Sequence, residues 1–173
     1  IAIAAFRGEV GAPASVSAIV RADLERSGLF RSVDAPPNLD ERSALPQAEL
    51  RGRGADALLA GSMMRLADGT FDIRYKLWDA VRGSEHFARA TTVVAADLRL
   101  AAHRIADEIY EKLTGERGVF ATRIAYVTKA GRNFTLRITD ADGEGGQVAL
   151  ASAEPIISPA WSPSGKELAY VSF

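Results

Sequence analysis

The chain of 173 residues contains no cysteine. Disulfide bonds and thiolate chemistry, whether catalytic or metal-binding, are therefore excluded. The absence of cysteine fits the cytosol and the periplasm equally, so it does not assign a compartment. Histidine is also scarce, because the chain has two imidazoles, His86 and His103.

Long apolar runs and a strong net charge are missing as well. No apolar run approaches the ~20 residues that a membrane-spanning helix needs. The formal net charge of −1 gives no general attraction to nucleic acid or to an anionic membrane. Hydrophobic residues make up 47% of the chain and charged residues 25%, as in an ordinary soluble protein. We therefore expect no nucleic-acid partner and no membrane insertion.

The first two thirds of the chain mix helix and strand patterns. Residues 14–27 and 98–114 repeat apolar side chains at helical spacing, and residues 47–53 predict a shorter helix. Each long helix has a candidate N-cap and a glycine beyond its end: Ser15 and Gly28 for the first, Asp97 and Gly115 for the second. Strands are expected at residues 1–6, 29–33, 57–63, 71–77 and 85–94, with a hairpin turn at Asp68-Gly69. Residues 1–115 are therefore predicted to form an α/β domain with a mixed sheet.

From Thr122 onward the helical period disappears. Four strand patterns follow, at residues 123–128, 134–139, 148–151 and 156–161. The tetrapeptide beginning at Ile124 is echoed by the one beginning at Leu168, 44 residues later. A repeat of about 40–50 residues filled with short strands is typical of a β-propeller blade. We predict a linker at 116–121 and a propeller portion at 122–173, comprising one four-stranded blade and the first strand of the next.

Both ends of the chain suggest a longer protein. The chain begins at Ile1 and not at methionine, and its first apolar stretch is too short for a signal-peptide core. A propeller needs about 4–8 blades, and about one is present. We therefore expect a processed or cut start and further blades after Phe173.

Two patterns of acidic and imidazole side chains resemble metal sites. His103, Asp107 and Glu111 are spaced to share one helix face, but polar residues opposite an apolar stripe usually form the solvent-facing side. The segment from Asp140 to Gly145 resembles the start of a calcium loop, but its twelfth position is Ala151 where the loop needs glutamate. A hairpin turn between strands is the favoured interpretation of this segment. No metal site is predicted.

The remaining candidates favour structural roles. Arg51–Gly54 is a small basic patch without neighbouring aromatics, so a solvated helix end is favoured over nucleic-acid binding. His86 is expected to be exposed, and Trp161 and Tyr170 are expected to pack between blades. No Gly-x-Ser-x-Gly elbow occurs, and nothing places a nucleophile beside a base. We predict no catalytic residue and no cofactor, and we assign no partner-binding residue.

Several segments in combination carry a resemblance to a known family. They are Ser158–Phe173, which contains Trp-Ser-Pro-Ser-Gly, and Ile19–Phe30, Gly54–Gly61, Asp107–Gly115 and Phe120–Val127. Together they resemble the TolB family, the soluble periplasmic proteins of the Tol-Pal system, and Ser158–Phe173 is similar to the family's propeller repeat. Ser164 replaces the usual aspartate of that repeat, and we expect the turn to persist with a weaker side-chain bond.

This resemblance implies a monomeric, non-enzymatic interaction protein of the periplasm. Such proteins combine an α/β amino-terminal domain with a six-bladed propeller. They bind the lipoprotein Pal through the propeller and the membrane-anchored TolA through a segment that would precede Ile1. The system keeps the outer membrane attached and constricting during cell division. The alternative is a prolyl-oligopeptidase-like serine peptidase, whose catalytic domain would follow a similar propeller.

Overall fold

The computed structural model describes residues 1–173, which form two compact units, Ile1–Phe120 and Ala121–Phe173. The first unit combines three α-helices with four strands, in agreement with the expected α/β class. A short 3₁₀ turn, Ala95–Asp97, leads into its last helix. The elements in chain order are β1 (Ala2–Ile3), α1 (Val16–Arg26), α2 (Gln47–Gly52), β2 (Ala57–Arg65), β3 (Phe71–Asp79), β4 (Ser84–Val93) and α3 (Leu98–Thr114).

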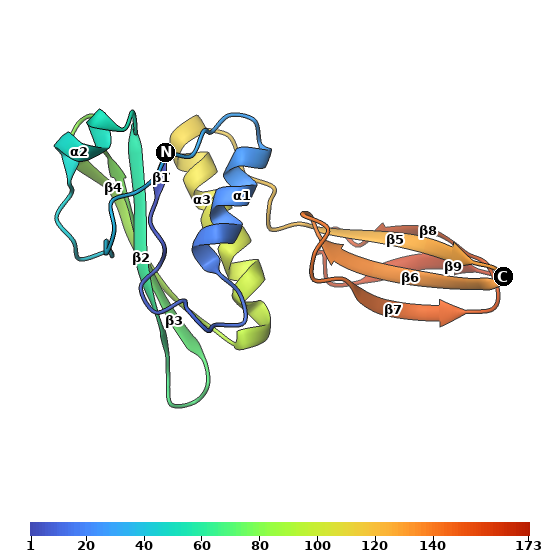
Figure 1. Cartoon of the computed structure of the whole chain (residues 1–173). Helices are drawn as coiled ribbons and strands as arrows, with labels where there is room; N and C mark the ends of the chain where they lie inside the picture. Colours follow the sequence, from blue (N-terminus) through green and yellow to red (C-terminus); the bar gives the residue numbers. More distant parts are fainter. The chain divides into compact units, whose positions relative to one another are not determined.

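The first unit is built on one mixed sheet with the strand order β1-β2-β3-β4. Strand β1 runs parallel to β2, while β2, β3 and β4 pair antiparallel. Helices α1 and α3 cover one face of this sheet, and α2 lies on the other (Figure 1). This arrangement confirms the predicted mixed sheet. No helix is long and apolar enough to cross a bilayer.

Alternation along β3 explains why the sheet has two covered faces. Ile73 and Leu77 point toward α1 and α3 and are fully buried, whereas Trp78 belongs to a smaller cluster under α2. Helix α3 contributes Ile105 and Ile109 to the larger cluster. Burying one such side chain stabilises the fold by about 1.5–3 kcal/mol, so this cluster dominates the stability of the unit.

The helix ends follow the sequence prediction in three of four cases. The Oγ of Ser15 accepts a hydrogen bond from the N–H of Ala18 (3.3 Å). Gly28 (φ 75°) and Gly115 (φ 80°) adopt the left-handed conformation beyond α1 and α3. Asp97 occupies the N-cap position of α3, but its side chain makes no capping bond. An N-cap residue normally has an extended backbone. The backbone of Asp97 (φ −98°, ψ 4°) instead continues the 3₁₀ turn.

The predicted strands agree best with the structure at the β2–β3 hairpin, where a turn sequence sets the strand ends. The Asp68-Gly69 turn joins β2 to β3, with Gly69 at φ 85° and the Asp68 carboxylate accepting from the N–H of Thr70 (3.0 Å). The first strand is shorter than expected, since β1 spans two residues where residues 1–6 were predicted. The segment 29–33 forms one isolated bridge, between Val33 and Ala2, and no regular strand.

The second unit contains five strands in two sheets. One sheet has the order β5-β6-β7 and the other pairs β8 with β9, all antiparallel. The bounds are β5 (Arg123–Ala130), β6 (Asn133–Asp140), β7 (Gln147–Ser152), β8 (Ile156–Trp161) and β9 (Leu168–Ser172). This antiparallel region agrees with the expected start of a propeller.

One detail of the blade prediction is wrong. Strand β8 was expected to complete a four-stranded first blade, but it pairs with β9 and not with β7. The 44-residue repeat explains the difference, because it aligns β5 with β9. The strand that precedes β9 therefore belongs to the second copy of the repeat, and the first copy is represented by β5, β6 and β7.

Candidate functional site

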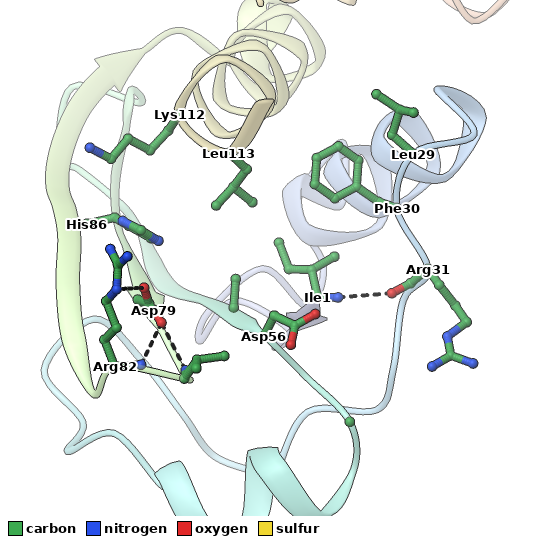
Figure 2. Close-up of a pocket in the computed structure, with 13 residues that line it drawn as sticks. Ile1, Leu29, Phe30, Arg31, Asp56, Asp79, Arg82, His86, Lys112 and Leu113 are labelled. Carbon is green, nitrogen blue, oxygen red and sulfur yellow. Dashed lines mark hydrogen bonds and ion pairs between the residues drawn. The ribbon is translucent and has the colours of Figure 1, made fainter. Parts of the chain in front are cut away.

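A cavity of about 670 Å³ opens at one end of the sheet in the first unit. Its walls come from the start of β2, the end of β3, the start of β4, the end of α3 and the segment that follows α1 (Figure 2). The cavity forms because the chain leaves α1 through Gly28 and runs past the open end of the sheet. These segments meet at one recess together with Ile1 at the start of the chain.

The cavity has an apolar interior and a charged border. Phe30 and Leu113 face it from the segment after α1 and from α3 (Figure 2). Arg31, His86 and Lys112 line it as well. His86 is half-buried there, so the expectation that it is exposed is wrong. Because Asp56 and Asp79 line it too, the border carries charges of both signs, and the recess suits an apolar group with polar or charged neighbours.

Two acidic residues, Asp56 and Asp79, line the border, and Asp79 is engaged in the β3–β4 turn. Its carboxylate accepts hydrogen bonds from the backbone N–H groups of Arg82 (2.7 Å) and Val81 (2.9 Å). The backbone hydrogen bond from Arg82 is the main cause that holds the pKa of this carboxyl below its usual value; desolvation opposes it, and the bond from Val81 adds to it. The carboxylate therefore stabilises the turn and stays ionised at neutral pH.

Three aromatic rings connect one wall of the cavity to the end of the first unit. The ring centroids of Phe30 and Tyr110 lie 6.0 Å apart, and those of Tyr110 and Phe120 lie 5.6 Å apart in an edge-to-face arrangement. The backbone N–H of Phe120 donates to the carboxylate of Asp107 (2.7 Å). These contacts fix the stretch after α3 against that helix.

The chemistry of the lining favours binding. No serine, threonine or cysteine lines the cavity, so no hydroxyl or thiol nucleophile faces it. The one carboxylate at the β3–β4 turn is held by backbone amides. The arrangement can hold a partner segment or small anion, and it does not assemble the groups of an acyl-transfer centre.

The structure separates the residues that were weighed as a metal face on α3. His103 is 1% exposed, and its Nδ1 lies 2.6 Å from Oδ2 of Asp23 on α1. Asp107 accepts the hydrogen bond from Phe120, and Glu111 is exposed. The expectation that all three form the solvent-facing side of α3 is therefore wrong for His103, because the packing of α1 against α3 buries a wider stripe than the apolar residues alone indicate.

The other sequence candidates have structural roles. The segment after Asp140 is a hairpin turn, as predicted, with Gly143 at φ 89° and Asp142 accepting from the N–H of Glu144 (2.9 Å). In the basic patch, Arg51 donates to the carbonyl oxygen of Val81, which ties α2 to the β3–β4 turn. The end of α2 is therefore attached to the sheet through Arg51, whereas a solvated helix end was predicted.

The remaining candidates are Arg53, in the basic patch Arg51–Gly54, and two aromatic residues of the second unit. Arg53 pairs with Glu49 (2.6 Å). The ring of Trp161 lies under the guanidinium of Arg123 at 4.9 Å, and Tyr170 is 44% exposed. Packing of these two aromatics between blades stays a prediction.

Sequence reasoning missed Glu9, a buried carboxylate at the start of α1. It accepts hydrogen bonds from the N–H groups of Phe6 (3.0 Å) and Ser17 (3.1 Å) and from the hydroxyl of Ser17. The available signal was an acidic residue shortly before a helix N-terminus, where negative charge is favoured. Its position in a loop, between Gly8 and Gly11, gives no local sign that the side chain is buried.

Two family models match the chain in the order of its two units. Residues 1–86 match the TolB amino-terminal domain, and residues 110–173 match the TolB beta propeller domain. The two matched regions together leave out the residues between 86 and 110, which contain the end of β4 and the first part of α3.

Individual relatives agree with the family models. The Tol-Pal system protein TolB of Polaromonas naphthalenivorans (strain CJ2) is 59% identical over 174 residues, and that of Azoarcus sp. (strain BH72) is 54% identical; each match covers 100% of this chain and 41% of the relative. The crystal structure of TolB from Acinetobacter baumannii superposes with a TM-score of 0.79 at 36% identity, covering 99% of this chain and 43% of that one. The chain thus spans about two fifths of the length of the curated relatives that it matches.

Proposed function

The chain belongs to the TolB family, and we propose on this basis that it serves as a non-enzymatic interaction protein of the Tol-Pal system in the periplasm. The observation that carries the proposal is the match of both units, in order, to the two domains of one family. The names of the curated relatives describe a Tol-Pal protein and mention no catalytic activity. The cavity of the first unit, with its lack of lining nucleophiles, supports a binding role.

The proposed partners are Pal and TolA, as in the family. A propeller that this chain begins would bind Pal, and a segment on the amino-terminal side of Ile1 would bind TolA. Together these contacts would maintain the outer membrane and its constriction during cell division. We propose residues 1–115 as the α/β domain, 116–121 as the linker and 122–173 as the propeller portion. No residue of this chain is assigned to either partner.

The serine peptidase alternative is not favoured. It would explain a propeller-like second unit, but it gives no reason for an amino-terminal match to TolB over residues 1–86. The α/β unit also matches the TolB crystal structure together with the second unit, over nearly the whole chain. A periplasmic scaffold accounts for both units at once.

A chimera tests the proposal in cells. Residues 1–173 would replace the aligned two fifths of the Polaromonas naphthalenivorans relative, with the rest of that protein retained. We expect the chimera to restore resistance to detergent and to stop leakage of periplasmic proteins in cells that lack TolB. The matched control is the same protein with the aligned segment deleted, which we expect to restore neither.

One result of the chimera experiment would contradict the proposal. A chimera that accumulates in the periplasm at the level of the native relative, yet leaves the cells leaky, would show that these residues do not perform the Tol-Pal role. Immunoblotting of the periplasmic fraction separates this result from simple failure of the chimera to accumulate.

A further inference from the structure

Strand β4 is an exposed edge of the sheet in the first unit. It ends the strand order and pairs with β3 alone. None of its ten residues is buried. An exposed edge presents backbone N–H and C=O groups to solvent, and proteins usually blunt such an edge with proline, lysine, bulges or short length.

The part of β4 from Phe87 to Val93 has one such device, the charged side chain of Arg89, which donates to the carbonyl oxygen of Ala88 (3.1 Å). It pairs with β3 without interruption, and the register shift is confined to the point between Leu77 and Trp78, at the other end of the strand. The segment contains no proline, and its one charged residue is Arg89. It is therefore a regular edge long enough to pair with another strand of several residues.

A shallow trough lies beside this edge on the face of the sheet away from α1 and α3. Its floor is Ala88 and Ala90, which pair across the sheet with Lys76 and Arg74. The trough has a volume of about 410 Å³, and Arg42 from the loop before α2 lines it as well. Small side chains on the edge strand thus leave room between long cationic ones.

In the ion pairs at the trough, one member is more exposed to solvent than the other. Arg42 pairs with Glu41 at 3.4 Å, and the side chains are 78% and 12% exposed. Arg74 pairs with Asp72 at 2.8 Å, and the side chains are 49% and 16% exposed. In both pairs the guanidinium is the outer group and the carboxylate the inner one. The third pair, Lys76 with Glu85, has the opposite order, with 23% and 47% exposure. An approaching strand would therefore meet two arginines first.

We propose that β4, between Phe87 and Val93, binds an extended acidic segment of a partner protein as an additional strand of the sheet. Main-chain hydrogen bonds to the free edge supply the pairing, and alternate side chains of the added strand lie over the Ala88–Ala90 trough. Acidic side chains at those positions would face Arg42 and Arg74. This inference rests on the first unit alone and does not depend on the proposed Tol-Pal role.

A second copy of the chain fits the edge less well. Antiparallel pairing of two β4 strands would bring Arg89, Arg42 and Arg74 of one copy close to the same residues of the other copy. Like charges placed opposite each other across strands are destabilising, and like-charge juxtaposition suppresses a wrong partner. The charge pattern therefore selects an acidic strand over self-pairing.

The test uses the 173-residue chain labelled with ¹⁵N and a synthetic ten-residue peptide in which Glu alternates with Val and Thr. We expect saturable binding with a Kd below about 1 mM, and shifts and slowed amide exchange confined to residues 87–93 and their neighbours. The control peptide carries Lys in place of every Glu and should not bind. Binding of the acidic peptide should weaken as salt is raised.

Charge reversal at two arginines of similar exposure tests whether the charge at the trough determines peptide affinity. Arg42→Glu, in an exposed loop, should weaken binding of the acidic peptide about fivefold. Arg82→Glu reverses a charge of similar exposure (82%) in the β3–β4 turn and should leave the affinity unchanged. The proposal is overturned if neither peptide binds, if both bind equally, or if the variants behave alike. It is also overturned if the β4 amides shift with protein concentration in the absence of peptide, which would indicate self-pairing.

Discussion

At the scale of single residues, the contact between Asp23 and His103 joins the two long helices of the first unit. Both side chains are 1% exposed, and the carboxylate of Asp23 also accepts from the guanidinium of Arg26 (2.9 Å). Removing one partner of a buried pair weakens the compensation of the other, and this costs more than the pair itself contributes. This contact is therefore expected to be sensitive to single substitutions.

We predict that Asp23→Ala lowers the free energy of unfolding by about 3–5 kcal/mol. His103→Ala should also be destabilising, and the double variant should lose less than the sum of the two single losses, because the contact between the two side chains can be lost only once. Urea unfolding of the four proteins followed by far-UV circular dichroism gives the coupling free energy. Strict additivity would contradict a direct interaction between the two side chains.

Asp79 should make the stability of the first unit depend on pH. Backbone hydrogen bonds, first from Arg82, lower the pKa of its carboxyl in the folded state. Its contribution is therefore fully present above the unfolded-state pKa of about 3.9 and is lost as pH falls through the lower folded-state pKa. We predict that the stability advantage of the native protein over Asp79→Asn is smaller at pH 3 than at pH 6. An advantage that is independent of pH would contradict this account of the turn.

At the scale of secondary-structure elements, Glu9 fixes the start of α1 to the loop that precedes it. Glu9→Ala would leave the N–H groups of Phe6 and Ser17 without their acceptor, and we predict a loss of about 2–4 kcal/mol. Glu9→Gln keeps one amide oxygen as an acceptor and should cost less. Thermal and urea unfolding of both variants tests this order. Equal losses would show that the carboxylate oxygens are not the relevant acceptors.

The elements that were predictable from sequence are those that local chemistry specifies. Ser15, Gly28 and the Asp68-Gly69 turn set the ends of α1 and the β2–β3 hairpin through their own backbone preferences. The burial of His103 and Glu9 and the pairing of β8 with β9 depend on tertiary neighbours. The cavity likewise needs distant segments, from Ile1 to Leu113, to meet, so no local pattern could indicate it.

At the scale of the whole molecule, the two units differ in how much apolar surface they bury. The first has a large cluster under α1 and α3, whereas the buried hydrophobic residues of the second are Leu136 and Ile156. Side chains such as Ile124, Val148 and Tyr170 are 44–54% exposed in the second unit. Since buried apolar surface supplies most of the folding free energy, the second unit should be the less stable one.

We predict that amide hydrogens of β5 to β9 exchange faster than those of β2 and β3 in the monomeric 173-residue chain. The difference should be at least about tenfold, because it reflects sub-global opening of the second unit while the first stays folded. Hydrogen exchange followed by mass spectrometry or NMR measures both units in one sample. Equal protection in the two units would contradict the expected difference in stability.

The most direct test of the central claim is calorimetric binding of purified, lipid-free Pal to the chimera that carries residues 1–173 in place of the aligned part of the Polaromonas naphthalenivorans relative. If these residues form the amino-terminal domain and the opening of a TolB propeller, they will complete that propeller. The account then predicts a Kd within about tenfold of that of the unmodified relative, a difference of no more than about 1.4 kcal/mol. A folded, monomeric chimera that shows no binding to Pal would contradict it.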